Sequence, residues 1–354
     1  DCFSGPWNVR SEKLQDSSFY VAANELRRAK STHKSNGRDI RLRCLFLESA
    51  SAPYQQLLRF AEETTYAEIK TLKAEFEDSV DDVVSFVRAG GRGSFPFVFV
   101  DPTGWTGFAL DVIAPLLQLN PGEVLINFMT GHIVRFAESS DAAIQKSFNR
   151  LFGTIDYRSR IQSLSGKDRE DELVRCYMDA IRETGGFKHV CAAIVLHPEK
   201  DRTHFHLIYA TRNLKGVEVF KQVEKKAMEV MEKARADAQQ RRRETKTGQA
   251  EFAFDGPVSC AGSHYEQLRD RYLRAAKDHV WALLTERQRL LFEHAWVGAL
   301  QFPLVWESDL KGWIEEWKSA GCIRLEGLSS SDRVPKREMG HWLVLLSTSE
   351  GTDA

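Results

Sequence analysis

Apolar and polar positions alternate in a regular way near the middle of the first half of the chain. Residues 95–100 (FPFVFV) are a short, continuous apolar run, which is typical of a strand buried on both faces of a parallel sheet. A polar turn, DPTGW at 101–105, follows, and residues 108–119 then carry apolar side chains at helical spacing. Residues 124–128 are a second apolar run. Asp101 is therefore expected at the carboxyl end of a strand, where open α/β sheets bind ligands.

The same alternation of strands and helices extends over the first part of the chain. A further buried strand is expected at residues 42–47 and a short strand within 69–76, and residues 1–6 (DCFSGP) look like the end of a first strand running into a turn. Residues 188–196 and 203–210 are two β-rich segments joined by a polar turn, which indicates an antiparallel hairpin. The pattern predicts a Rossmann-like, mostly parallel sheet with a terminal antiparallel hairpin over residues 1–216. The polar region 153–171 suits an insertion or a lid.

Two further segments follow this α/β domain. Residues 217–262 are expected to be a long helix and a linker, and the predicted buried stripe of the helix is Phe220, Val223, Ala227, Val230 and Met231. Residues 263–354 are expected to form helices that include 285–300 and 307–319, and two strands at 323–326 and 342–346 around a basic loop, which describes a winged-helix-like domain. Helix 307–319 carries Leu310, Trp313, Ile314 and Trp317 at a spacing that predicts their burial. Winged-helix domains usually bind nucleic acid, although many bind only protein. The candidate phosphate-binding residues are Arg241, Arg242 and Arg243 at the helix end, where the alternative is a solvated terminus, and Arg333, Lys336 and Arg337 in the loop.

Composition narrows the class of protein. A chain of 354 residues corresponds to about two domains, and 42% hydrophobic with 28% charged residues is ordinary for a globular protein. No apolar run approaches the ~20 residues of a membrane span, and the net charge of −1 argues against a wholly basic nucleic-acid coat. The six scattered cysteines fit reduced, buried thiols in a cytoplasmic protein. His204 and His206 share one face of a strand but lack a third ligand, so no metal site is expected.

Several motifs together resemble one family, the three-Cys-motif partner proteins (TcmP). They are DCFSGP at 1–6, RCLFLES at 43–49, FVFVDPTGWTG at 97–107, EVLINF at 123–128 and FHLIYATRNLKGVEVF at 205–220. The resemblance implies a class I methyltransferase-like Rossmann domain, a three-Cys-motif protein as partner, and a DNA- or RNA-directed role in a phage-related or defence system. Two positions depart from the expected patterns. Trp7 stands where the family commonly has a second glycine, and Thr103 stands where adenine N6-methyltransferases have a second proline.

Methyl transfer with S-adenosylmethionine would require a cofactor site and a catalytic turn. The turn after the first strand, with Asp1, Phe3, Ser4 and Gly5, would approach the methionine part of the cofactor, and Glu48 would bind the ribose hydroxyls. The turn after the fourth strand is a partial copy of the Asp-Pro-Pro-Tyr motif of adenine N6-methyltransferases. In it, Asp101 and Pro102 would hold the exocyclic amine of a base, and the ring of Trp105 would stack on that base.

Structural alternatives exist for each of these residues. Asp101 could cap a helix beginning near Thr106, Glu48 could pair with an arginine at the surface, and Trp105 could be a packing residue. Two functions are therefore carried forward. The first is a nucleic-acid-directed, S-adenosylmethionine-dependent methyltransferase. The second is a non-catalytic scaffold that keeps the fold and binds protein or nucleic acid.

Overall fold

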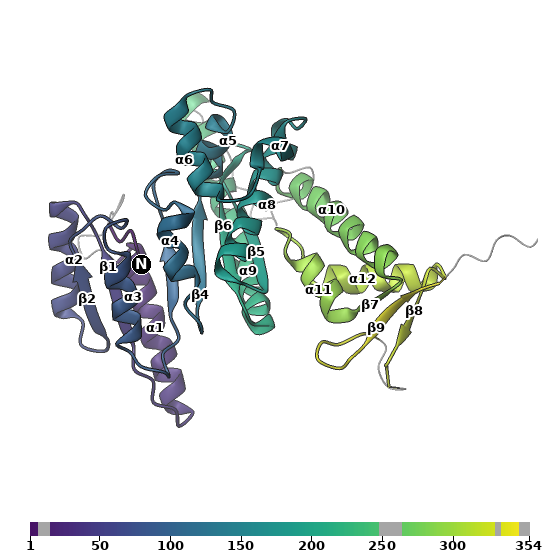
Figure 1. Cartoon of the computed structure of the whole chain (residues 1–354), viewed down its shortest axis with the longest axis horizontal. Helices are drawn as coiled ribbons and strands as arrows, with labels where there is room; N and C mark the ends of the chain where they lie inside the picture. Colours follow the sequence, from purple (N-terminus) through teal and green to yellow (C-terminus); the bar gives the residue numbers. More distant parts are fainter. Residues whose placement is uncertain (6–14, 248–263, 330–333, 347–354) are drawn as a thin grey trace, which may run out of the picture. The chain divides into compact units, whose positions relative to one another are not determined.

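The structure is a computed structural model that describes residues 1–5, 15–247, 264–329 and 334–346. These residues form a mixed α/β protein that divides into two compact units (Figure 1). The first unit contains residues 1–188 and 207–212, and the second contains residues 189–206 and 213–354. The second unit thus includes most of the hairpin, the long helix and the C-terminal block, which the sequence analysis had assigned to three different segments.

Two pairs of parallel strands form the sheet of the first unit. In the first pair, β1 (Arg43–Leu47) lies beside β2 (Glu68–Leu72), with Arg43 opposite Glu68. In the second pair, β3 (Phe97–Val100) lies beside β4 (Glu123–Phe128), with Val100 opposite Ile126. All four strands overlap segments where strands were predicted. Most side chains of β1 and β4 are buried. The expectation that β3 is buried on both faces was wrong, because Val98 and Val100 are buried but Phe97 is 53% exposed.

The N-terminal segment joins the two strand pairs. The Asp1 nitrogen donates to the Leu45 carbonyl (3.0 Å), and the Leu47 N–H donates to the Asp1 carbonyl (3.2 Å). Asp1 thus bonds to Leu45 and Leu47, the residues on either side of Phe46, and this hydrogen-bond pattern is that of parallel strands. On its other side, the Cys2 N–H donates to the Phe99 carbonyl of β3 (2.9 Å). The order in the first unit is therefore β2, β1, the N-terminal segment, β3 and β4.

Two further strands extend the sheet beyond β4. They are β5 (His189–Leu196) and β6 (Thr203–Thr211), and the order of this part of the sheet is β3-β4-β6-β5. Residues 197–202 join the two strands, and the His197 N–H closes this turn on the Arg202 carbonyl (2.9 Å). So short a connection between neighbouring strands requires an antiparallel pair, so the predicted hairpin is present.

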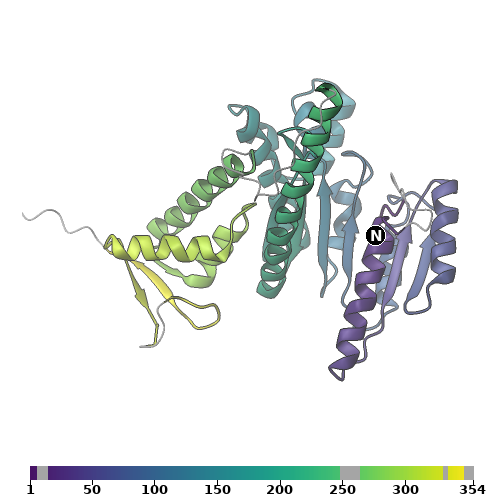
Figure 2. The same cartoon turned by 180° about the vertical axis from the view of Figure 1, so that it is seen from behind.

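Helices cover both sides of the strands of the first unit (Figures 1 and 2). On one side, Phe19 of α1 (Ser18–Ser35) and Phe60 of α2 (Ser51–Glu63) pack with Phe46 of β1. On the other side, α4 (Leu110–Leu117) packs against α3 (Val80–Arg88) and α8 (Gly166–Gly185). The core on that side is aromatic, and the rings of Phe128 and Tyr177 stack at 4.5 Å.

The region that the sequence analysis described as an irregular insertion or lid is helical, so that prediction was wrong. After α5 (Thr130–Phe136) and α6 (Ala142–Phe152), the chain forms α7 (Tyr157–Ile161) and enters α8 at Gly166. Asp156 caps α7 by accepting the Ser159 N–H. Tyr157 is 2% exposed and stacks on Phe152 at 4.6 Å. Burial of the Tyr157 ring stabilises a helical conformation in a segment whose polar composition predicts a loop.

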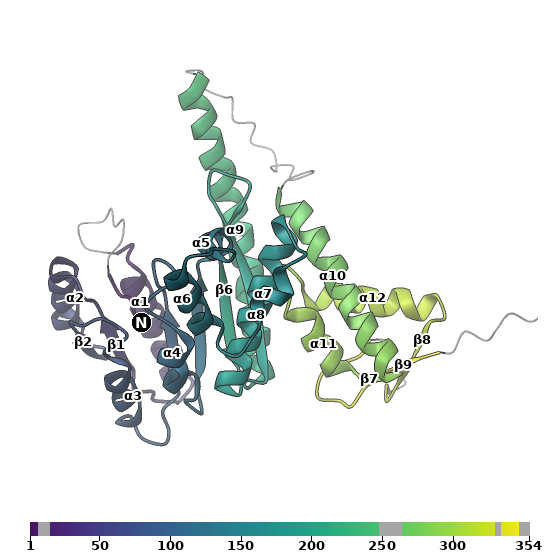
Figure 3. The same cartoon turned by 45° about the horizontal axis from the view of Figure 1, so that its top comes forward.

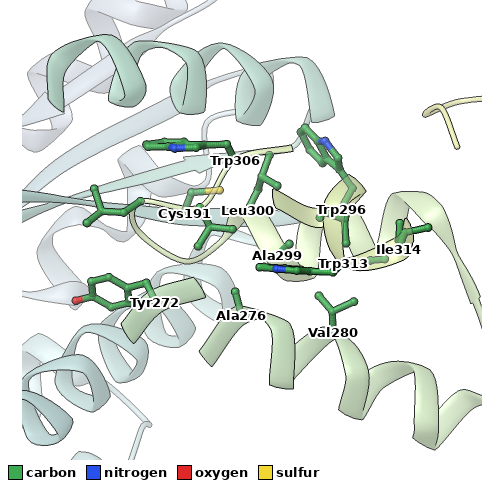
Figure 4. Packing of buried hydrophobic residues seen from close by; sticks show 14 of the residues in the cluster. Cys191, Tyr272, Ala276, Val280, Trp296, Ala299, Leu300, Trp306, Trp313 and Ile314 are labelled. Carbon is green, nitrogen blue, oxygen red and sulfur yellow. The ribbon is translucent and has the colours of Figure 1, made fainter. Parts of the chain in front are cut away.

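The C-terminal part of the second unit is a helical core with a small antiparallel sheet. It contains three helices and three strands in the sheet order β7-β9-β8, and Trp296, Trp306 and Trp313 lie in one apolar cluster with residues of β5 (Figure 4). The strands β8 and β9 lie where they were predicted, whereas a helix was predicted across β7. The bounds are α10 (His264–Arg287), β7 (Arg289–Leu291), α11 (Phe292–Leu300), α12 (Glu307–Ser319), β8 (Ile323–Glu326) and β9 (Trp342–Leu345).

The long helix α9 (Leu214–Thr247) is continuous, and it runs as a single rod in its unit (Figure 3). Its buried face was predicted only in part. Phe220 and Met231 pack against the core, whereas Ala227 is exposed and Val223 and Val230 are 57% and 70% exposed. The side chains that are buried on this helix include Val217, Lys221, Glu224, Met228 and Arg235. Charged side chains with partners thus take the place that apolar periodicity assigned to valines. Neither α9 nor any other helix in the described ranges is long and apolar enough to span a membrane.

Candidate functional site

The carboxyl ends of the parallel strands meet at one edge of the first unit. Because β1, the N-terminal segment, β3 and β4 are parallel neighbours, the residues that follow them gather at this edge. Those residues are Ser4, Gly5, Glu48 and Asp101, together with Asn127 near the end of β4. The sequence analysis singled out the first four.

Asp101 and Asn127 form a buried polar pair at this edge. The register that places Val100 opposite Ile126 brings the next residues side by side, and the Asn127 Nδ2 donates to Asp101 Oδ1 at 2.5 Å. Asn127 is 8% exposed, and Asp101 is partly exposed. Burial raises the pKa of Asp101, and the hydrogen bond from Asn127 acts in the opposite direction.

Sequence reasoning missed Asn127, although a signal for it was available. A buried strand rarely carries an amide in its interior, because the amide needs hydrogen-bond partners there. EVLINF has one such residue in an otherwise apolar run from Val124 to Phe128. An amide at the carboxyl end of a buried strand, opposite a carboxylate on the next strand, is a candidate site residue.

The helix-cap interpretation of Asp101 is wrong. The helix α4 begins at Leu110, not near Thr106, and its N-cap Ala109 makes no side-chain cap hydrogen bond. Residues 101–109 instead form an irregular segment that leads from β3 to α4. The carboxylate of Asp101 is directed to Asn127, so a local cap does not explain its presence.

Trp105 is a packed side chain beside a shallow cavity. Its ring centroid lies 4.6 Å from that of Phe136 and 5.8 Å from that of Phe148. The ring also borders a cavity of about 310 Å³ that Lys146 and Arg150 of α6 line. The packing alternative for Trp105 is thus present in the structure, and stacking on a base would use only the part of the ring that faces the cavity. Pro102 is buried.

The N-terminal turn is closed by its own hydrogen bonds. The Phe3 N–H donates to Asp1 Oδ1 (3.1 Å), and the Ser4 hydroxyl, which is fully buried, donates to the Asp1 carbonyl (3.0 Å). The ring of Phe3 packs on Phe76 at 5.3 Å, and Gly5 is buried. Trp7, which could decide whether a cofactor fits, lies outside the described residues.

Glu48 lies directly after β1 and is partly buried. Its Oε1 accepts the Ala50 N–H at 2.7 Å, which holds the turn into α2. A carboxylate held in this way keeps its second oxygen available for a ligand hydroxyl. The local structural role and the cofactor role of Glu48 are therefore compatible.

The basic residues proposed for nucleic acid do not form one patch in the second unit. Arg337 pairs with Glu218 at 2.6 Å and lies 4.4 Å from the Trp296 ring centroid. The pair lowers the pKa of Glu218. Glu218 and Arg241 are 23 residues apart on α9, which corresponds to about 35 Å along a helix axis.

The other basic candidates lie apart or are engaged by the backbone. Arg241 and Arg243 are exposed at the end of α9, while Arg242 donates to the Glu199 carbonyl at 3.0 Å. Lys336 is exposed, and Arg333 lies outside the described residues. The helix α12 has an acidic excess, with Glu307, Asp309, Glu315 and Glu316 against Lys311 and Lys318. Within the described ranges, no group of three or more His, Cys, Asp or Glu side chains could hold a metal ion.

Comparisons with known proteins add little to this geometry. No family model matches the chain, and no curated protein matches it. Among solved structures, the chain is similar to the protein LPL1258 of Legionella pneumophila, which is assigned to the family model DUF519. The two share 10% sequence identity with a TM-score of 0.34, and the match covers 64% of this chain and 80% of that one.

Proposed function

We propose that the first unit is a class I methyltransferase-like domain that binds S-adenosylmethionine at the carboxyl ends of its strands and acts on a nucleic-acid base. The strand order carries this proposal. Parallel strands run outward on both sides of the N-terminal segment, and the β5–β6 hairpin lies beyond β4. This order, with the first strand central and an antiparallel hairpin at one edge, is the arrangement of class I methyltransferases. The motifs that resemble TcmP support the same domain type.

The described residues of the cofactor site fit S-adenosylmethionine. The turn at Ser4 and Gly5 is compact and tied to Asp1, so the backbone after the first strand offers close approach. Glu48 places a carboxylate at the end of the neighbouring strand, where a ribose hydroxyl would donate to it. When bound, the cofactor supplies an electrophilic methyl group.

Asp101 is the residue proposed to act on the substrate. Its carboxylate stands at the end of β3, next to the central segment, and its partner Asn127 leaves one oxygen available. A carboxylate there accepts a hydrogen bond from the amine of a base and orients the nitrogen toward the cofactor site. The packed ring of Trp105, four residues further along the chain, borders a cavity and offers it an apolar wall.

A second candidate function is a scaffold that binds a protein partner, such as a three-Cys-motif protein. The element order from α10 to β9, with two strands closing on β7, resembles that of a winged helix and supports this candidate. In nucleic-acid-binding winged helices, the helix that precedes the two-stranded wing contacts DNA. Here that helix is α12, whose acidic excess disfavours contact with phosphates, and Arg337 of the wing loop is paired with Glu218. These charges favour protein over nucleic acid as the partner of the second unit.

Calorimetric titration with S-adenosylmethionine tests the methyltransferase proposal. We expect the full chain to bind the cofactor, and Glu48→Ala to weaken the binding by about tenfold to a hundredfold, as the loss of a charged hydrogen bond predicts. Glu63→Ala, at the exposed end of α2, is the matched control and should bind as the unmodified chain does. Absence of binding at millimolar cofactor would leave the scaffold function.

A further inference from the structure

The amide of Asn127 contains a hydrogen-bond acceptor that the fold does not use. Its Nδ2 faces the carboxylate of Asp101, and this fixes the orientation of the amide, because an amide oxygen in that position would face another negative oxygen. The opposite atom, Oδ1, is buried and has no hydrogen-bond partner in the part of the chain that the structure describes. Buried amide oxygens without a donor are uncommon, so this oxygen requires an explanation.

The position of Asn127 in the strand separates it from the aromatic core. Successive side chains of a strand point to opposite faces, so Asn127 and Phe128 face different sides of the sheet. Phe128 stacks on Tyr177 of α8, and its side is filled by rings. Asn127 lies on the face that carries Asp101 and Leu125, and both of these residues are partly exposed. The amide therefore does not serve the packing of α8.

The pair presents two acceptors at the ends of adjacent parallel strands. One is the Oδ2 of Asp101, since Oδ1 already accepts from Asn127, and the other is the Oδ1 of Asn127. Side chains of register neighbours lie on the same face and within about 5 Å at Cα. A group with two N–H donors on one nitrogen can satisfy two acceptors, whereas a hydroxyl with a single donor can satisfy only one of them.

We propose that Asp101 and Asn127 together bind the –NH₂ group of an aromatic base, with one N–H directed to each acceptor. The proposal rests on the proposed function, and it extends that function by adding Asn127 of β4 as a second residue that binds the amine. Because burial raises the pKa of Asp101, the site suits a neutral amine better than an ammonium ion, which needs a fully charged partner. Adenine, cytosine and guanine carry this group, whereas uracil and purine do not.

Binding of matched nucleosides to the full chain tests the site. S-adenosylhomocysteine is titrated first, and the nucleosides are then titrated with it present at saturation, so that they cannot occupy a cofactor pocket. We expect adenosine to bind at least about tenfold more tightly than purine riboside, which lacks only the amino group. Cytidine against uridine is a second pair and shows which base the site accepts. Equal binding within both pairs, or no nucleoside binding at millimolar concentration, would overturn the proposal.

Variants then assign the effect to the amide. Asn127→Ala should remove most of the preference for the amine, and Asn149→Ala, an exposed asparagine on α6, should retain it. A preference that survives Asn127→Ala contradicts the role of this residue. Circular dichroism shows whether Asn127→Ala folds. If it does not fold, the comparison of paired nucleosides on the unmodified chain still tests whether the site prefers an amine. Binding of S-adenosylhomocysteine without amine preference rejects this site and leaves the methyltransferase proposal intact. If S-adenosylhomocysteine does not bind, the nucleosides are titrated alone, and an amine preference then rejects only the cofactor part of the proposed function.

Discussion

Two buried polar pairs, one in each unit, differ in how completely the fold surrounds them. Lys221 and Glu224 of α9 are each 4% exposed and form an ion pair. Asp101 and Asn127 form a pair at the edge of the sheet of the first unit, where one amide oxygen is buried without a donor. In the first pair, Glu224 Oε1 accepts the Leu304 N–H and Oε2, which makes no hydrogen bond, lies in the ion pair with Lys221. In the second pair, Asn127 Oδ1 has neither a donor nor a cation beside it among the described residues. The presence of a cation or donor at each buried oxygen thus distinguishes the structural pair from the candidate site.

The ion pair on α9 holds a loop of the second unit. Lys221 Nζ donates to the Phe302 carbonyl at 2.8 Å, and Glu224 Oε1 accepts the Leu304 N–H at 2.9 Å. Leu304 has a φ of +58°, a conformation that side chains rarely adopt without support from their surroundings. The ammonium also lies 5.2 Å from the Trp306 ring centroid. The charges therefore fasten α9 to the core that the tryptophans form.

The largest expected effect comes from breaking the structural pair. Lys221→Met should destabilise the second unit by about 3–5 kcal/mol, because it leaves a buried carboxylate without a partner. Urea unfolding followed by tryptophan fluorescence measures the change. Lys226→Met, at an exposed position of the same helix, is the control and should be nearly neutral. Lys221→Met/Glu224→Leu should recover most of the loss, and a failure to recover would mean that the charges do more than balance each other.

A smaller effect on stability is expected from the other pair. Asn127→Ala loses one hydrogen bond to Asp101 but also removes an acceptor that has no donor, so the two changes oppose each other. The free energy of unfolding should change by about 1 kcal/mol or less. The same urea titration, compared with Lys221→Met, gives the contrast. If Asn127→Ala lowered the free energy of unfolding as much as Lys221→Met does, the Asp101–Asn127 pair would also be a structural pair.

The exposed valines of α9 should tolerate a charge. Val230 is 70% exposed, so Val230→Lys should change the free energy of unfolding by less than about 0.5 kcal/mol. Met228, two residues away, is 3% exposed, and Met228→Lys should be strongly destabilising because it buries an unpaired ammonium. The thermal midpoints of the two variants test the assignment of faces. Equal losses would show that the valine stripe is covered in solution.

The weakest effect expected is on the pH dependence of the first unit. Burial raises the pKa of Asp101, so the folded state binds this proton more readily than the unfolded state. The stabilisation is complete below the unfolded pKa of about 3.9 and is lost as pH rises through the folded pKa. Because the Asn127 hydrogen bond lowers the pKa, Asn127→Ala should raise it further. A carbon-13 titration of the carboxyl group measures both values, and an unchanged pKa would contradict the coupling.

The helices α9 and α12 show where reading a sequence succeeds and fails. The stripe of Leu310, Trp313, Ile314 and Trp317 on α12 was predicted from spacing, and all four side chains are buried. The same rule applied to α9 selected valines that are exposed. The rule assumes that charges face water, and α9 breaks it because Lys221 and Glu224 neutralise each other inside the protein.

The strand runs, the hairpin, α12 and the position of Asp101 at a strand end were determined by the sequence itself. They depend on local periodicity and turn chemistry, which neighbouring residues encode. Only the tertiary structure decided which strands are neighbours. It also decided the register of β3 and β4, which places Asn127 beside Asp101. It also decided that Arg337 pairs with Glu218, 119 residues away. Contacts between residues distant in the chain depend on the packing of whole elements, and a single sequence carries no local signal for them.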